Sequence, residues 1–185
     1  MSALILLAAG RSQRFGSDNK LLADFRGKPL ALHTADAVSQ CWTGERIAVV
    51  SDEAVRLLLE TAGWACVKNH RPAAGQASSL RLGVKAAGAQ TVVIALADMP
   101  NIDATHIDQV AVAAKEHGTA ISIFNGQRMP PAGFSSDFRE ALVTLRGDQG
   151  ARAVYERYPG AELPLDAASM RDIDRPKDLA LERTP

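Results

Sequence analysis

Short apolar runs alternate with amphipathic stretches along most of the chain. Residues 4–8 and 91–97 are apolar without a helical period, which is typical of strands buried on both faces of a sheet. Shorter apolar runs at 46–50, 64–67 and 120–124 also predict strands. Apolar residues three or four positions apart predict helices at 29–42, 53–62, 78–87, 105–117, 138–145 and in a segment that ends at Tyr158. This alternation predicts an α/β fold.

The loop after the first predicted strand, residues 9–20, has the composition of a phosphate site. Gly10 and Gly16 allow the backbone to turn sharply and to approach a ligand, and ligands of open α/β sheets bind at the carboxyl ends of strands. The donors and cations of this loop are Arg11, Ser12, Arg14 and Lys20. The loop is neither a P-loop nor a dinucleotide-binding turn, because the glycine spacing of both motifs is absent. Residue types alone leave a triphosphate site and an ordinary surface loop equally open.

A second polar loop, residues 69–76, leads into the helix predicted from Ser78. The amino end of that helix suits an anion or contacts to a base, although Ser78 or Ser79 would serve equally well as a plain helix cap. Asp98 directly follows the strand at 91–97, so its carboxylate should lie at the same sheet edge as the first loop. It is the best metal-ligand candidate, and the alternative is a turn aspartate before Pro100.

Four ordered motifs resemble the MobA-like nucleotidyltransferases, in particular their molybdenum cofactor cytidylyltransferase branch. They are Leu-Ala-Ala-Gly-x-Ser-x-Arg-Phe-Gly-x-x-x-Lys-Leu-Leu at 7–22, Gly-x-x-Ser-Ser-Leu at 75–80, Leu-x-Asp-x-Pro at 96–100 and Asp-Ile-Asp-Arg-Pro-Lys-Asp-Leu at 172–179. The last motif departs from the family pattern, since Arg175 and Lys177 replace a threonine and a glutamate. The resemblance implies a single Rossmann-like three-layer α/β/α domain over residues 1–185, with a mostly parallel sheet of the nucleotide-diphospho-sugar transferase type.

The same resemblance implies a function and a set of site residues. It implies transfer of CMP from CTP to molybdopterin or the molybdenum cofactor, with release of pyrophosphate and with Mg²⁺ as cofactor. Lys20, Arg14 and Asp98 would be catalytic, and Asp98 and Asp174 would hold the metal. The nucleotide would be bound by Leu7, Ala8, Ala9, Gly10, Arg11, Ser12, Lys20, Gly75, Gln76, Ser78 and Ser79. Two alternatives remain: a related transferase with another phosphate acceptor, such as a sugar or polyol phosphate, and a non-catalytic factor that inserts the finished cofactor into a molybdoenzyme.

Two later segments resemble regions beside the acceptor in this family. Residues 125–133, rich in glycine, arginine and proline, predict an excursion over the acceptor side of the site. Residues 146–152 are the other segment, and a helix cap followed by a solvated arginine explains them nearly as well.

Composition excludes several other classes of function. Lys plus Arg and Asp plus Glu number 21 each, so charge gives no reason to expect nucleic acid or an anionic membrane as partner. The two cysteines, Cys41 and Cys66, and the four histidines lack metal-ligand spacing. We therefore expect buried free thiols in a cytoplasmic protein. The family resemblance implies CTP, a molybdopterin-type acceptor and a molybdoenzyme or its maturation factor as partners.

Overall fold

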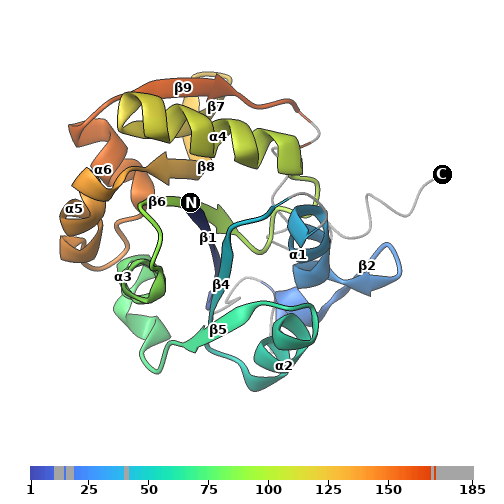
Figure 1. Ribbon diagram of the computed structural model, residues 1–185. Coiled ribbons are helices and arrows are strands. Elements are labelled where there is room, and N and C mark those ends of the chain that lie inside the picture. Colours follow the sequence, from blue (N-terminus) through green and yellow to red (C-terminus); the bar gives the residue numbers. More distant parts are fainter. Residues whose placement is uncertain (11–14, 16–18, 40–41, 168, 170–185) are drawn as a thin grey trace.

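The computed structural model describes residues 1–10, 15, 19–39, 42–167 and 169. A seven-stranded sheet runs through this part of the chain, in the order β5-β4-β1-β6-β8-β7-β9 (Figure 1). Its strands are β1 (Ser2–Ala8), β4 (Glu45–Val50), β5 (Ala65–Lys68), β6 (Thr91–Leu96), β7 (Thr119–Phe124), β8 (Gln127–Phe134) and β9 (Ala161–Pro164). All neighbouring pairs are parallel except the two that involve β8, so the expected mostly parallel sheet is confirmed.

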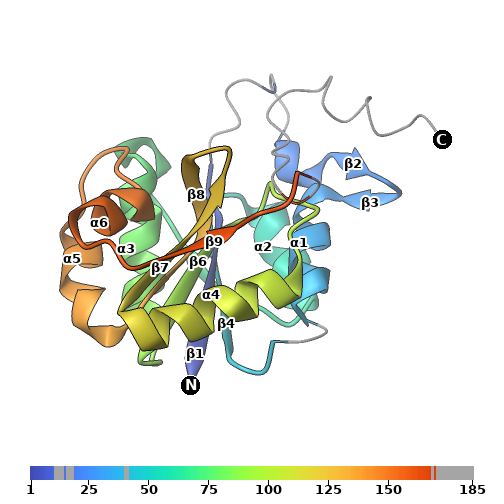
Figure 2. The ribbon, with the colours of Figure 1, turned by 90° about the horizontal axis from the view of Figure 1, so that it is seen from above.

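Helices cover both faces of the sheet, which gives the expected three layers (Figure 2). One face carries α1 (Leu30–Ser39), α2 (Glu53–Thr61) and α4 (Ala104–His117), and the other carries α3 (Gln76–Ala86), α5 (Arg139–Thr144) and α6 (Ala151–Arg157). The central strand β1 shows why two layers are needed. Leu4 and Leu6 pack into the α1 side, while Ala3 and Ile5 pack into the α3 side. No helix in the described part of the chain is long and apolar enough to cross a membrane.

The expected excursion at residues 125–133 is wrong, because most of this segment forms β8 inside the sheet. Proline has no N–H for a strand ladder and argues against a central strand. Here the pairing with β7 jumps from Ile121–Ala132 to Ser122–Met129, which leaves Pro130 and Pro131 as a bulge. The Ser122 hydroxyl donates a hydrogen bond of 2.8 Å to the Pro131 carbonyl and so satisfies part of the interrupted ladder.

The start of the first helix is also corrected. Pro29 was expected to begin it, but Pro29 pairs with Asp24 in a small hairpin of β2 (Asp24–Phe25) and β3 (Lys28–Pro29), and α1 begins at Leu30. Arg26 and Gly27, at the tip of the hairpin, have φ values of 50° and 85°. Positive φ at both turn positions is the geometry of a tight two-residue hairpin. The sequence lacks the usual Asn-Gly signal at this turn, so the hairpin was not predicted.

Candidate functional site

The carboxyl ends of four parallel strands form one edge of the sheet. Leu7 of β1 pairs with Leu96 of β6, and Val50 of β4 pairs with Lys68 of β5, so the segments that follow these strands emerge together. Beyond the strands, the Ala97 amide donates to the Leu7 carbonyl at 3.2 Å. This edge is the crevice where open α/β sheets bind ligands.

Lys20 and Asp98 meet at this edge, although 77 residues separate them in the chain. The Lys20 ammonium lies 2.5 Å from Oδ2 of Asp98, and their side chains are only 12% and 18% exposed. A short 3₁₀ helix, Lys20–Leu22, presents the lysine, and the Asn19 side chain caps this helix by accepting from the Leu21 amide. A partly buried ion pair at a strand edge offers opposite charges at one point of the crevice, one suited to a cation and the other to phosphate.

Ala9 joins the loop after β1 to the start of α3. Its side chain is 5% exposed and belongs to the same apolar cluster as Ala77 and Leu80. On the other side, the Ser51 hydroxyl donates to the Ala9 carbonyl at 3.4 Å. Leu7 is half-buried, Ala8 is buried, and Gly10 is exposed at the crevice end of β1. The first loop and the first turn of α3 are therefore neighbours, as a shared nucleotide site requires.

Two backbone amides at the amino end of α3 already donate hydrogen bonds to carbonyl groups of the protein. The N-cap is Gly75, with φ of 87°, and no side chain caps the helix, so the alternative interpretation of Ser78 or Ser79 as a helix cap is wrong. The Ala77 amide donates to the Gly147 carbonyl at 3.0 Å, and the Ser78 amide donates to the Gly75 carbonyl at 3.1 Å. With these two donors engaged, this helix end is poorly suited to an anion and better suited to a base or ribose.

Gly75 and Gly147 lie so close together that only glycine fits at position 75. A Cβ added there would lie 2.2 Å from the Gly147 carbonyl oxygen, and one added at Gly150 would lie 2.6 Å from Oε1 of Gln76. The segment 146–150 thus packs directly on the first turn of α3. This contact gives residues 146–150 a definite position beside the predicted nucleotide loop.

Asn69 is the polar residue of this region that sequence reasoning missed. It follows β5, is 3% exposed, and donates through Nδ2 to both Ser78 Oγ (2.8 Å) and Ser79 Oγ (2.9 Å). Its only sequence signal is its place between a predicted strand and the polar loop at 69–76.

Four predicted site residues, Arg11, Ser12, Arg14 and Asp174, lie outside the described residues, and so does Cys41. Within the described part of the chain, no group of three or more His, Cys, Asp or Glu side chains could hold a metal ion. Magnesium needs only one or two carboxylates when phosphates and water complete its shell, so Asp98 fits the role that the sequence suggests.

His106, His33 and Cys66 have structural contacts. His106 is buried and shares a 2.7 Å hydrogen bond with Ser122, and burial lowers its pKa. His33 bonds to the Phe25 carbonyl, and burial lowers its pKa as well. Cys66 is half-buried rather than buried, and desolvation raises its pKa to about 11, so it is a thiol at neutral pH.

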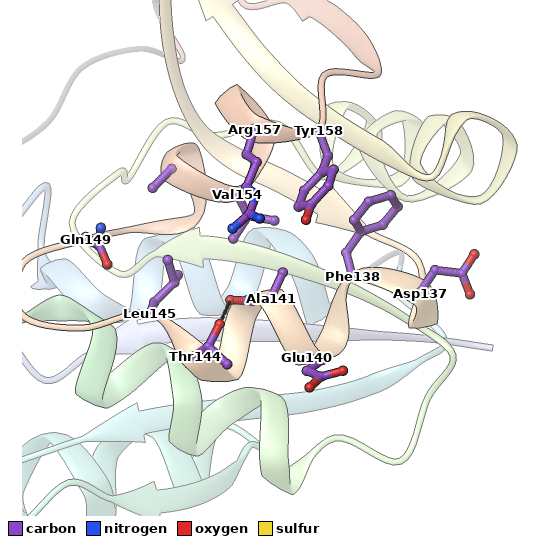
Figure 3. Close-up of a pocket in the computed structure, with 11 residues that line it drawn as sticks. Asp137, Phe138, Glu140, Ala141, Thr144, Leu145, Gln149, Val154, Arg157 and Tyr158 are labelled. Carbon is purple, nitrogen blue, oxygen red and sulfur yellow. Dashed lines mark hydrogen bonds between the residues drawn. The ribbon is translucent and has the colours of Figure 1, made fainter.

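A hollow of about 650 Å³ lies between α5 and α6 (Figure 3). The rings of Phe138 and Tyr158 meet at one end, with centroids 5.3 Å apart, and Gln149 lies at the other. None of the predicted site residues lines it. Its walls are mixed in character, with Asp137, Glu140 and Arg157 beside the rings.

Comparison with known proteins adds a family to this geometry. Residues 4–162 match the MobA-like NTP transferase domain. The chain is 31% identical to the purine catabolism protein PucB of Bacillus subtilis, over 97% of this chain and 94% of PucB. It is 32% identical to a probable molybdenum cofactor guanylyltransferase of Pyrococcus horikoshii, over 74% of this chain and 71% of that protein.

Solved structures confirm the fold. The crystal structure of Rv0371c from Mycobacterium tuberculosis superposes with a TM-score of 0.83 at 24% identity, covering 99% of this chain and 98% of that one. A complex of Rv0371c with manganese superposes with a TM-score of 0.78 at 22% identity, covering 98% of this chain and 97% of that one. The overall fold is therefore shared with these solved structures.

Proposed function

We propose that this chain, which belongs to the MobA-like NTP transferase family, transfers CMP from CTP to a molybdopterin-type acceptor and releases pyrophosphate. The observation that carries the proposal is the pair Lys20–Asp98 at the crevice edge, next to the loop after β1. A protein that only binds nucleotide has no need of a carboxylate beside the triphosphate, because that charge repels phosphate unless a metal ion intervenes.

The metal in this proposal is Mg²⁺, held by Asp98 and Asp174 together with phosphate oxygens. When bound, it would neutralise charge on the phosphates and orient them for displacement. Asp98 would hold the cation, and Lys20, whose ammonium lies 2.5 Å from this carboxylate, would contact the phosphates beside it.

The chemistry needs position and charge rather than a protein nucleophile. A phosphate oxygen of the acceptor attacks the α-phosphorus of CTP in line with the bond to the leaving pyrophosphate. Backbone amides of residues 9–12 would hold the β- and γ-phosphates. Lys20 and Arg14 would offset the negative charge that grows on the leaving group, which is the interaction that strengthens in the transition state.

CTP is proposed over GTP because of Ala9. The family resemblance implies a second glycine at this point of the motif in relatives that use GTP, whereas the Ala9 methyl here lies in one apolar cluster with Ala77 and Leu80 of α3. We expect this methyl to narrow the floor on which a guanine would lie, so that the smaller pyrimidine fits better. Relatives such as the Pyrococcus protein are named guanylyltransferases, so the choice between CTP and GTP is the part of the proposal that is tested first.

Nucleotide preference is measured as pyrophosphate release with CTP or GTP at fixed Mg²⁺ and acceptor. We expect CTP to be preferred, and we expect Ala9→Gly to relax the preference without inverting it, because the 75–80 loop is unchanged. Equal rates with both nucleotides in the wild type, or faster release with GTP, would place the chain in the guanylyl branch.

A second candidate is a related transferase with another small phosphate acceptor, such as a sugar or polyol phosphate. The acceptor is left open by PucB, which matches nearly the whole chain and whose name gives purine catabolism but no acceptor. Substituting the acceptor in the same assay separates the two.

A further inference from the structure

We infer that Asn69 is a positioning residue that gives Ser78 and Ser79 different tasks, leaving the Ser79 hydroxyl as a hydrogen-bond donor to the nucleotide. The inference rests on the proposed function, since it places the nucleotide beside α3. It also names a residue that the family motifs in this sequence do not include.

The orientation of the Asn69 side chain is fixed by its surroundings. Its Oδ1 accepts from the backbone amide of Arg71 at 2.8 Å, and this amide can only donate. The other end of the side chain is therefore the NH₂ group. Its two N–H bonds point at Ser78 Oγ and Ser79 Oγ, so each hydroxyl oxygen acts as an acceptor toward Asn69.

The two hydroxyl protons must then point elsewhere, and here the serines differ. Ser78 donates to the Gly75 carbonyl at 2.8 Å, with the Arg71 carbonyl also at 3.4 Å. It thereby ties the 69–75 loop to α3. Ser79 donates to no group among the residues that the structure describes, although it is only 7% exposed. A nearly buried hydroxyl with a spare proton favours a ligand that offers an acceptor atom.

The matching ligand chemistry is an acceptor oxygen or nitrogen of a base or ribose. A phosphate is disfavoured, because the Ala77 and Ser78 amides at the same helix end are already bonded to Gly147 and Gly75. Asn69 itself is too buried to touch the nucleotide, so it acts through Ser79. Replacing its NH₂ by a carboxylate oxygen would reverse the direction of the hydrogen bond and draw the Ser79 proton away from the ligand.

The test is a double-mutant cycle on CTP affinity, measured by calorimetry with Mg²⁺ and without acceptor, alongside kcat, KM and Tm. Ser79→Ala and Asn69→Asp should each weaken CTP binding on the order of fivefold, as loss of one neutral hydrogen bond does, with KM rising more than kcat falls. The double variant should bind CTP no more weakly than either single variant, because both changes remove the same interaction.

Ser78→Ala should lower Tm more than Ser79→Ala does and should weaken CTP binding less. Thr61→Ala deletes an exposed helical hydroxyl and should change none of these quantities.

Additive losses in the double variant, or unchanged CTP affinity in Ser79→Ala, would overturn the inference. In either case normal CMP transfer by the wild type would leave the proposed function standing. A wild type that binds neither CTP nor GTP would retire both together.

Discussion

The sheet has two halves that differ in strand direction and in chemistry. In the half formed by β5, β4, β1 and β6, every strand runs the same way, so every strand ends at one edge and delivers a segment to the same crevice. In the half formed by β8, β7 and β9, the antiparallel β8 breaks this alignment. The first half gathers Lys20, Asp98, Ala9 and Asn69, whereas none of these residues lines the hollow between α5 and α6. Parallel alignment is what concentrates polar groups at one place.

The largest effect is expected from Asp98→Asn in the first half. The substitution removes one charge with almost no change in volume, so the fold should persist while pyrophosphate release falls on the order of a hundredfold or more. Asp36→Asn is the matched control, since Asp36 also pairs with a lysine, Lys28, but on α1. Near wild-type release by Asp98→Asn would show that this carboxylate does not hold the metal.

Lys20→Ala should slow turnover about tenfold or more and weaken CTP binding, because a placed ammonium is lost from the phosphates. Lys28→Ala removes the same charge from a side chain that is 37% exposed in a surface pair, and should change turnover little. The rates and CTP affinities of both variants are compared at one ionic strength. Equal losses would mean that general positive potential matters rather than the position of Lys20.

Two glycine substitutions, one in each half, compare how the two halves of the sheet affect nucleotide binding. Gly75→Ala would press on Gly147, and Gly133→Ala would press on α4 through Ala114 and the Val110 carbonyl. Both should destabilise the fold by about 1–3 kcal/mol, but only Gly75→Ala should raise KM for the nucleotide.

Gly27→Ala is the control for backbone conformation, because Gly27, like Gly75, has a positive φ but faces open space. It should cost about 1 kcal/mol and leave KM unchanged. A raised KM in Gly133→Ala would contradict the separation of the halves.

The smallest effect concerns pH and the second half. Burial holds the pKa of His106 below its ordinary value, against the opposing charges of Asp103 and Asp166. The unfolded chain therefore binds a proton first, so the stability that neutral His106 contributes is present above about pH 6.5 and is lost as pH falls toward the folded pKa. Denaturant unfolding between pH 8 and pH 5 should show a decline in free energy that is shallower in His106→Gln. An identical slope in that variant would place the dependence elsewhere, with His33 as the next candidate.

Sequence patterns predicted the first half of the sheet far better than the second. The strands β1, β4, β5 and β6 are apolar runs set off by polar loops. In contrast, β8 contains Pro130, Pro131 and Gly133, whose local preferences oppose a strand, and tertiary pairing overrides them. The short strand β9 alternates between exposed and half-buried residues and has no apolar run to reveal it.

The meeting of Lys20 and Asp98 was predictable from the sequence, whereas the arrangement of the neutral groups was less so. Lys20 and Asp98 each follow a buried strand in a polar segment, and the α/β pattern alone brings such segments to one edge. The arrangement around Asn69 depends on which of several neutral donors and acceptors meet after folding, and no spacing in the sequence encodes that. The same holds for Gly147, whose contact with α3 joins positions 70 residues apart.

Transfer of the α-phosphate itself tests the central claim most directly. The purified protein is incubated with Mg²⁺, a molybdopterin acceptor and CTP labelled at the α-phosphorus, and both the labelled product and pyrophosphate are quantified over time. We expect label to enter the acceptor in equal amount to the pyrophosphate released, with neither formed when the acceptor is omitted or when Asp98→Asn replaces the wild type. Tight binding of CTP with no label in any acceptor would contradict the account and identify a protein that holds nucleotide or cofactor without transferring it.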